Sequence, residues 1–111
     1  MLAELPGLTY VALEGGGTVA DIWEREAERV AATVIRVSAE DWRRELLYPR
    51  EQRTGTQAKQ HADVLARRVI AWSGAPRPTS LTHDAAEAVL VGLWASLSLG
   101  WLAAPPAALR R

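Results

Sequence analysis

Cysteine is absent from the 111 residues, and only two histidines, His61 and His83, are present. The missing thiols exclude disulfide-stapled scaffolds, thiol nucleophiles and cysteine-based zinc sites. Two histidines are also too few for a multi-histidine metal centre, so any bound metal is a hard cation held by carboxylates. Hydrophobic residues make up 49% of the chain, which is enough to build a core, and the length suits one domain or part of one.

A secretory signal and a long apolar span are lacking as well. The chain does not begin with a basic segment followed by an apolar core, which argues against a signal peptide. The uncharged run 88–104 is 17 residues long and contains Ser96 and Ser98, whereas a membrane helix usually needs about 20 apolar residues. We therefore expect a buried core helix here, no membrane contact and a cytoplasmic protein, with a membrane-associated protein as the weaker alternative.

The net charge is zero, but the charges are unevenly distributed. Residues 1–42 carry eight acids and three arginines, whereas residues 43–68 carry seven bases and three acids. A basic middle segment permits a phosphate-binding surface without requiring one.

The hydrophobic pattern predicts the order strand–helix–strand–helix–helix–helix. Strands are expected at 8–14 and 34–37, and helices at 18–33, from Ser38 through Leu47, at 56–73 and from about Thr82 to Leu102. Thr18 with Asp21, and Ser38 with Asp41, have the spacing of N-terminal capping boxes. Two strands separated by a helix predict a parallel pair. Such a pair is a poor core by itself, so the pattern is typical of the back half of an α/β domain.

Three carboxylates lie at positions where they could form a catalytic or metal-binding site. Glu14 ends an apolar strand just before three glycines, and Asp84 and Glu87 project from one face at the start of an apolar helix. The ordinary alternatives are a strand-end residue that reaches solvent and two acids that complement a helix dipole. If the strand and the helix pack side by side, the three acids form a cluster that binds a divalent cation and activates water for phosphodiester attack.

Three segments resemble the RuvC-type Holliday junction resolvases of the RNase H-like superfamily. They are Tyr10-Val-Ala-Leu-Glu14, Gly55-Thr-Gln-Ala-Lys59 and His83-Asp-Ala-Ala-Glu-Ala-Val-Leu90, and they occur in the family's order. The resemblance covers nearly all of the chain but only the C-terminal part of the family's domain. It implies a partial RNase H-like α/β fold over residues 1–104, followed by an Ala/Pro/Arg tail at 105–111.

The resemblance also implies a function. Proteins of this family are metal-dependent endonucleases that cut branched DNA, and they act as homodimers, here through helix 18–33. By this resemblance Glu14, Asp84 and Glu87 are expected to hold Mg²⁺ or Mn²⁺, and Lys59 is expected to approach the phosphate near the scissile bond as a further catalytic residue. Together with Lys59, three arginines are expected to contact DNA: Arg43, Arg44 and Arg53.

The chain departs from the family's pattern at its start. In the family an Asp on an earlier strand completes the metal site, whereas Met1–Gly7 contains no Asp, and Glu87 stands where the family has a second Asp. Two interpretations stay open. The chain is either a resolvase whose N-terminal segment is missing, or a catalytically incomplete DNA-binding or assembly fragment of that fold.

Overall fold

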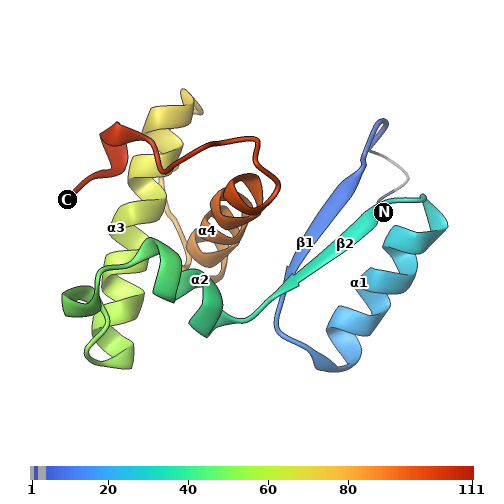
Figure 1. The fold of residues 1–111 in the computed structure, drawn as a ribbon, viewed down its shortest axis with the longest axis horizontal. Helices are drawn as coiled ribbons and strands as arrows, with labels where there is room; N and C mark the ends of the chain where they lie inside the picture. The colour runs from blue at the N-terminus through green and yellow to red at the C-terminus, as the bar shows by residue number, and fades with distance from the viewer. Residues whose placement is uncertain (1, 3–4) are drawn as a thin grey trace. The chain divides into compact units, whose positions relative to one another are not determined.

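The structure is a computed structural model that describes residue 2 and residues 5–111. The chain forms two compact units, residues 1–39 (the N-terminal unit) and residues 40–111 (the C-terminal unit), and each is described by itself. The order of the main elements is β1, α1, β2, α2, α3 and α4, as Figure 1 shows. The predicted order strand–helix–strand–helix–helix–helix is therefore confirmed, and the fold is mixed α/β.

The N-terminal unit is built on a parallel pair of strands. β1 (Tyr10–Glu14) and β2 (Thr33–Val37) run parallel, with Tyr10 opposite Thr33 and Glu14 opposite Val37. The helix α1 (Gly17–Arg29) connects them. Branched side chains dominate β2, which suits an extended backbone. The predicted parallel pair is confirmed.

The start of α1 differs from the prediction. The N-cap is Gly16, which offers no side-chain cap, so the predicted capping role of Thr18 is wrong. The helix begins one residue before Thr18 because Gly15 and Gly17, with φ of 85° and 79°, reverse the chain within a left-handed turn. A residue with a Cβ is strained in that conformation.

The end of α1 comes at Arg29, four residues before the predicted end at Thr33. The N–H of Ala32 donates to the carbonyl of Ala27 at 2.9 Å, and the N–H of Ala31 donates to that of Glu28 at 3.1 Å. This pair of bonds is a Schellman motif, which closes the last helical turn. Ala31 occupies its left-handed position, with φ of 57°, where glycine is usual.

The core of the N-terminal unit is small. Its buried members are Leu2, Ala27 and Ala32, and half-buried side chains pack against them: Leu8, Val11, Trp23, Val30 and Val34. Alanines contribute little apolar area, so most of the burial in this cluster comes from side chains that solvent still reaches.

The C-terminal unit is helical. It contains α2 (Ala39–Leu46, beginning at the unit boundary), the 3-10 turn η2 (Pro49–Glu51), α3 (Gly55–Ser73), α4 (His83–Ser98) and the 3-10 turn η3 (Ala107–Leu109). The helices α3 and α4 pack against each other. Buried alanines at 58, 62 and 66 recur every four residues along α3, which lets a neighbouring backbone approach closely. The largest fully buried side chains of the chain lie in this unit: Trp42, Leu65 and Leu90.

The end of α4 also precedes its predicted position at Leu102. The helix ends at Ser98, and Gly100 takes a left-handed conformation with φ of 76°. The N–H of Trp101 donates to the carbonyl of Ser96 at 2.9 Å, so a second Schellman motif closes this helix. Over residues 2 and 5–111, no helix combines the length and the apolar character that crossing a membrane requires.

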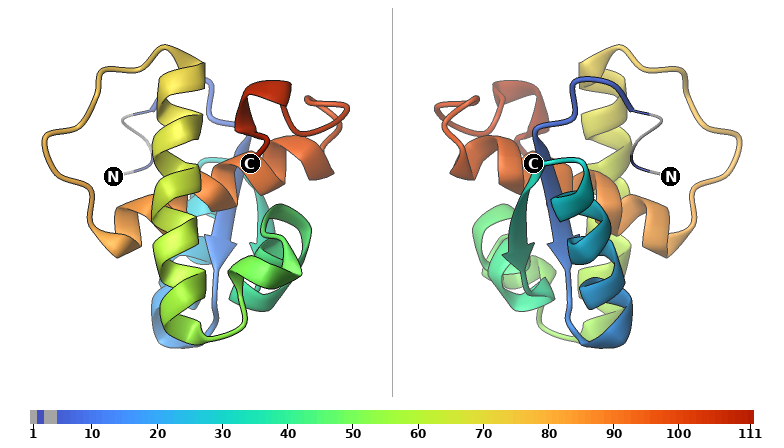
Figure 2. Two further views of the ribbon diagram at one scale, coloured as in Figure 1. Left: turned by 90° about the vertical axis from the view of Figure 1, so that its left-hand side faces the viewer. Right: turned by 90° about the vertical axis from the view of Figure 1, so that its right-hand side faces the viewer.

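The segment after α4 returns to α3. η3 packs against α3, and Leu109 is buried. Figure 2 shows this segment and, on another side of α3, the extended loop 74–82 that connects α3 to α4. The segment after α4 therefore uses α3 as its support.

Candidate nucleic-acid interface

The three predicted DNA-binding arginines line one pocket at the start of α3. Arg43 and Arg44 come from α2, and Arg53 comes from the loop before α3. The pocket has a volume of about 400 Å³, and its other lining residues are Glu40, Gln52, Thr54, Gly55 and Ala58. We call it the arginine pocket. Its three guanidinium groups face one carboxylate in the lining, so the pocket is basic.

The backbone around the arginine pocket is fixed by two side chains. Thr54 caps α3, because its Oγ1 accepts a hydrogen bond from the N–H of Gln57 at 3.1 Å. The Nε2 atom of Gln52 donates to the carbonyls of Arg43 and Leu47, both at 3.2 Å, and ties the loop to the end of α2. The remaining N–H groups of the first helical turn have no intrahelical acceptor, and the helix dipole places partial positive charge here. The pocket therefore combines this partial charge with the guanidinium groups.

Arg43 is held inside the protein rather than extended into solvent. Its Nη2 atom pairs with Glu87 Oε1 at 3.4 Å, and its guanidinium carbon lies 5.3 Å from the centre of the Trp42 ring. Its Nε atom is buried and has no hydrogen-bond partner among the residues that the structure describes. Arg43 thus lends positive charge to the pocket from a fixed position and keeps one donor unused.

Arg44, Arg53 and Lys59 are the accessible cations. Arg44 pairs with Asp41 at 2.8 Å, but its side chain is 71% exposed, and an exposed pair of this kind contributes little. Arg53 and Lys59 are exposed, and neither forms an ion pair with a residue in the described part of the chain. Lys59 lies on α3 about one turn beyond Gly55. All three side chains are accessible to a phosphate group from solution.

The two predicted acids of α4 lie near the helix start but differ in surroundings. Thr82 caps the helix, since its Oγ1 accepts a hydrogen bond from the N–H of Ala85 at 3.2 Å. Asp84 is exposed and accepts no hydrogen bond from any described side chain. Glu87 is 20% exposed and is engaged by Arg43. The carboxylate of Asp84 is available to bind a cation, whereas Glu87 can do so only after its ion pair with Arg43 breaks.

Glu14, the third predicted acid, ends β1 as expected and is half-buried opposite Val37. It belongs to the N-terminal unit, whereas Asp84, Glu87 and Lys59 belong to the C-terminal unit. Within either unit, as far as its residues are described, no group of three or more His, Cys, Asp or Glu side chains could hold a metal ion. The joint carboxylate cluster with bound Mg²⁺ or Mn²⁺ stays a prediction.

The shortest and most buried ion pair among the described residues of the C-terminal unit was not predicted. Glu51, which is only 4% exposed, receives two hydrogen bonds from Arg111: Nε to Oε2 at 2.8 Å and Nη2 to Oε1 at 2.5 Å. These bonds, together with one from the N–H of Tyr48 at 2.9 Å, lower the pKa of Glu51 to about 2 although burial acts in the opposite direction. His61 Nδ1 lies 3.3 Å from the same carboxylate. Because 60 positions separate the partners, no local sequence pattern links them.

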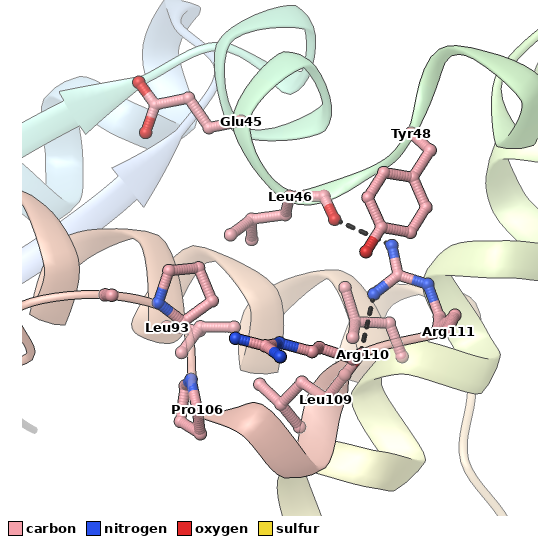
Figure 3. Close-up of a pocket in the computed structure, with 11 residues that line it drawn as sticks. Glu45, Leu46, Tyr48, Leu93, Pro106, Leu109, Arg110 and Arg111 are labelled. Atoms are coloured by element: carbon pink, nitrogen blue, oxygen red, sulfur yellow. Dashed lines mark hydrogen bonds between the residues drawn. The ribbon is translucent and has the colours of Figure 1, made fainter.

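Arg111 also fastens the end of the chain to the helices. Its guanidinium donates to the carbonyls of Leu46 at 2.9 Å and Leu109 at 3.0 Å, the two dashed contacts in Figure 3. It lies 4.6 Å from the centre of the Tyr48 ring. Arg111, Leu46 and Leu109 are among the residues that line the pocket in Figure 3. The contact that holds the chain end in place therefore forms part of the wall of this pocket.

Comparison of the chain with protein-family models, with curated proteins and with solved structures gives no match. A functional conclusion consequently depends on the residues of the chain and on the geometry described above.

Proposed function

We propose that the protein binds the phosphate backbone of branched DNA through the arginine pocket, as part of a metal-dependent endonuclease that resembles the RuvC-type resolvases. The observation that carries the proposal is the convergence of Arg43, Arg44 and Arg53 on the N-terminus of α3. These residues come from two separate segments of the sequence. Their convergence is what a phosphate-binding surface requires, and a merely solvated basic helix face does not need it.

The chemistry of the arginine pocket suits a phosphate. Guanidinium groups bind phosphate oxygens through charge-assisted, often bidentate hydrogen bonds. Free N–H groups at a helix N-terminus add donors that point at the same anion. Lys59 extends the positive surface along α3, so that a second phosphate of the backbone can be neutralised.

The catalytic part of the proposal assigns the cation to Glu14, Asp84 and Glu87. Carboxylate oxygens are the donors that Mg²⁺ and Mn²⁺ prefer, and the exposed Asp84 fits this use. A divalent cation bound there would supply an activated water and positive charge for the leaving oxygen. Lys59 adds positive charge beside the phosphate undergoing attack. An RNase H-like fold, a homodimer formed through α1 and a cytoplasmic location belong to the same proposal.

The binding claim is tested with a fluorescent four-way DNA junction and the double variant Arg44→Gln/Arg53→Gln. Loss of two phosphate contacts reduces the slope of log affinity against log salt by about 2. The matched control is Arg25→Gln/Arg29→Gln, which removes the same charge from exposed positions of α1. Equal effects of the two double variants would contradict a specific role of the arginine pocket.

The catalytic claim is tested by cleavage of the same junction with and without Mg²⁺ or Mn²⁺. The proposal predicts metal-dependent, paired nicks that Glu14→Gln abolishes while junction binding stays intact. If Glu14→Gln instead reduces binding and cleavage equally, a folding defect explains the loss.

A second candidate function is a catalytically incomplete DNA-binding or assembly fragment of the same fold. The ion pair between Glu87 and Arg43 favours it, because this pair draws one of the three acids away from a cation. Tight junction binding without any nick in Mg²⁺ or Mn²⁺ would select this candidate over the endonuclease.

A further inference from the structure

A second surface of the C-terminal unit lies along α3, away from the pocket at its start. One hollow of about 430 Å³ lies between α3 and the returning segment 75–78. An adjoining hollow of about 510 Å³ extends towards η2 and includes Arg50 and His61. The two hollows share Val64 and Arg68 in their linings and therefore adjoin each other along α3; we call the two together the α3 groove. The loop 74–82, which is drawn in Figure 2, contributes Ala75, Arg77 and Pro78 to the lining of the first hollow.

The length of the α3 groove suits a helix. Its lining residues extend along α3 from His61 to Ala71 and continue to Ala75 in the loop. At about 1.5 Å of rise per residue, the part from His61 to Ala71 corresponds to roughly 15 Å, or about three helical turns.

The floor of the α3 groove is apolar. Val64 is 46% exposed at the point where the two hollows meet. Ile70, Ala71, Ala75 and Pro78 continue the apolar lining. The arginine pocket has no apolar side chain larger than Ala58. A phosphate backbone gains nothing from such a floor, whereas aliphatic side chains of a partner would be removed from water there.

The rim of the α3 groove is basic. Arg67 pairs with Asp63 at 3.3 Å, and Arg68 donates to the carbonyl of Arg110 at 2.8 Å, so both are held at the rim. Arg77 makes no ion pair or hydrogen bond with any residue that the structure describes. The one acid of the second hollow, Glu51, is already neutralised by Arg111. The rim therefore retains positive charge for an acidic partner.

We infer that the α3 groove binds an acidic amphipathic helix of a partner protein. The apolar face of the helix lies on Val64, Ile70 and Pro78, and its carboxylates face Arg67, Arg68 and Arg77. This mode buries one apolar stripe of a helix in a groove and uses the flanking charges for orientation. The inference does not depend on the proposed DNA-binding function, because the two surfaces have no lining residue in common.

The test uses fluorescence anisotropy of the full chain with a labelled model peptide. The peptide has about 16 residues, with leucines at i, i+3, i+4 and i+7 and glutamates on the flanks. The expected result is saturable binding that weakens at least about tenfold for a scrambled peptide of the same composition, since scrambling destroys the apolar stripe. A scrambled peptide that binds equally well would overturn the inference.

Variants of the protein test whether the peptide binds in the α3 groove. Val64→Glu and Arg77→Glu each weaken peptide binding, Val64→Leu retains it, and Arg25→Glu on α1 serves as the charge-matched control. Unchanged binding by both groove variants would overturn the inference. Displacement of the peptide by an unlabelled DNA junction would assign the groove to nucleic acid. Self-association of the chain in sedimentation that Val64→Glu abolishes would assign the groove to a second copy. Either result would also overturn the inference.

Discussion

The two units of the chain bury apolar side chains to different degrees. In the N-terminal unit the buried cluster consists of Leu2 and two alanines, and Val37 is the one buried residue of the two strands. In the C-terminal unit Trp42, Leu65 and Leu90 are fully buried, and even the last segment contributes Leu109. Charge follows the same division, because acids dominate residues 1–42 and bases dominate residues 43–68.

The C-terminal unit therefore has a core that can support binding surfaces, whereas the strand pair of the N-terminal unit needs further packing partners to be stable. A parallel pair of strands normally requires covered faces and further strands for stability. The helical unit has a core of its own and holds the arginine pocket and the α3 groove on rigid elements. The comparison thus predicts that the main stability of the chain resides in residues 40–111.

The largest expected effect concerns the two cores. Leu90→Ala should lower the free energy of unfolding by about 2–5 kcal/mol, because it opens a cavity in a fully buried site. Val34→Ala in half-buried β2 should lower it by only about 1 kcal/mol. Urea unfolding followed by circular dichroism measures both. Equal losses would break the comparison between the units.

The next effect concerns the buried ion pair. Glu51→Gln should destabilise the protein by about 3 kcal/mol, because the guanidinium of Arg111 then stays buried without its carboxylate. Asp63→Asn, which breaks the more exposed ion pair between Asp63 and Arg67, should cost less than about 1 kcal/mol. Thermal unfolding of both variants at neutral pH checks the difference. A Glu51→Gln variant as stable as Asp63→Asn would show that the pair contributes nothing.

The same carboxylate predicts the dependence of stability on pH. The pKa of Glu51 is lowered to about 2 in the folded protein, while an unfolded glutamate titrates near 4.3. The resulting stabilisation is present above the unfolded pKa and is lost as the pH falls through about 2, with a total on the order of 3 kcal/mol. Unfolding midpoints measured between pH 6 and pH 2 cover the range in which this stabilisation is lost. Glu51→Gln should lack this part of the pH dependence, and an identical profile in both proteins would contradict the assignment.

A smaller effect of opposite sign is expected at the end of α1. Ala31→Gly should stabilise the protein by up to about 1 kcal/mol, because glycine adopts the left-handed conformation without the Cβ clash. Ala32→Gly is the neighbouring control and should destabilise, since Ala32 is buried and does not have a positive φ. Chemical unfolding gives both signs, and stabilisation by both substitutions would contradict the account.

The smallest effect is expected at Arg36. Its guanidinium pairs with Asp21 at 3.2 Å and with Glu24 at 2.6 Å, and these groups are at the surface. Arg36→Gln should therefore leave the unfolding midpoint at neutral pH nearly unchanged, at low and at high salt. A clear fall in the unfolding midpoint of Arg36→Gln at low salt would show that the surface charges of the N-terminal unit compensate for its small core.

Much of the fold was predictable from local patterns. The apolar run at 8–14 and the branched residues at 34–37 indicated the strands, and α4 begins beside Thr82, where the sequence predicted its start. The errors lie at helix ends. Gly100 carried a stop signal that the apolar run beyond it obscured, whereas Ala31 gave no signal, because an alanine rarely occupies a left-handed position.

The candidate site was predictable only in part. The resemblance singled out Arg43, Arg44 and Arg53, and the structure places all three in the lining of one pocket, while their contact with DNA stays a prediction. The ties between Arg43 and Glu87 and between Glu51 and Arg111 join residues 44 and 60 positions apart. Such pairs are created by helix packing and leave no trace in local sequence, so the sequence could not show that Glu87 is already engaged.

The most direct test of the central claim is an amide and arginine side-chain NMR titration of the chain with a four-way DNA junction. The account predicts the largest shifts at Thr54, Gly55 and the side chains of Arg44 and Arg53, which form the pocket at the start of α3. Shifts confined to the α3 groove or to α1, with the arginine pocket unaffected, would contradict it.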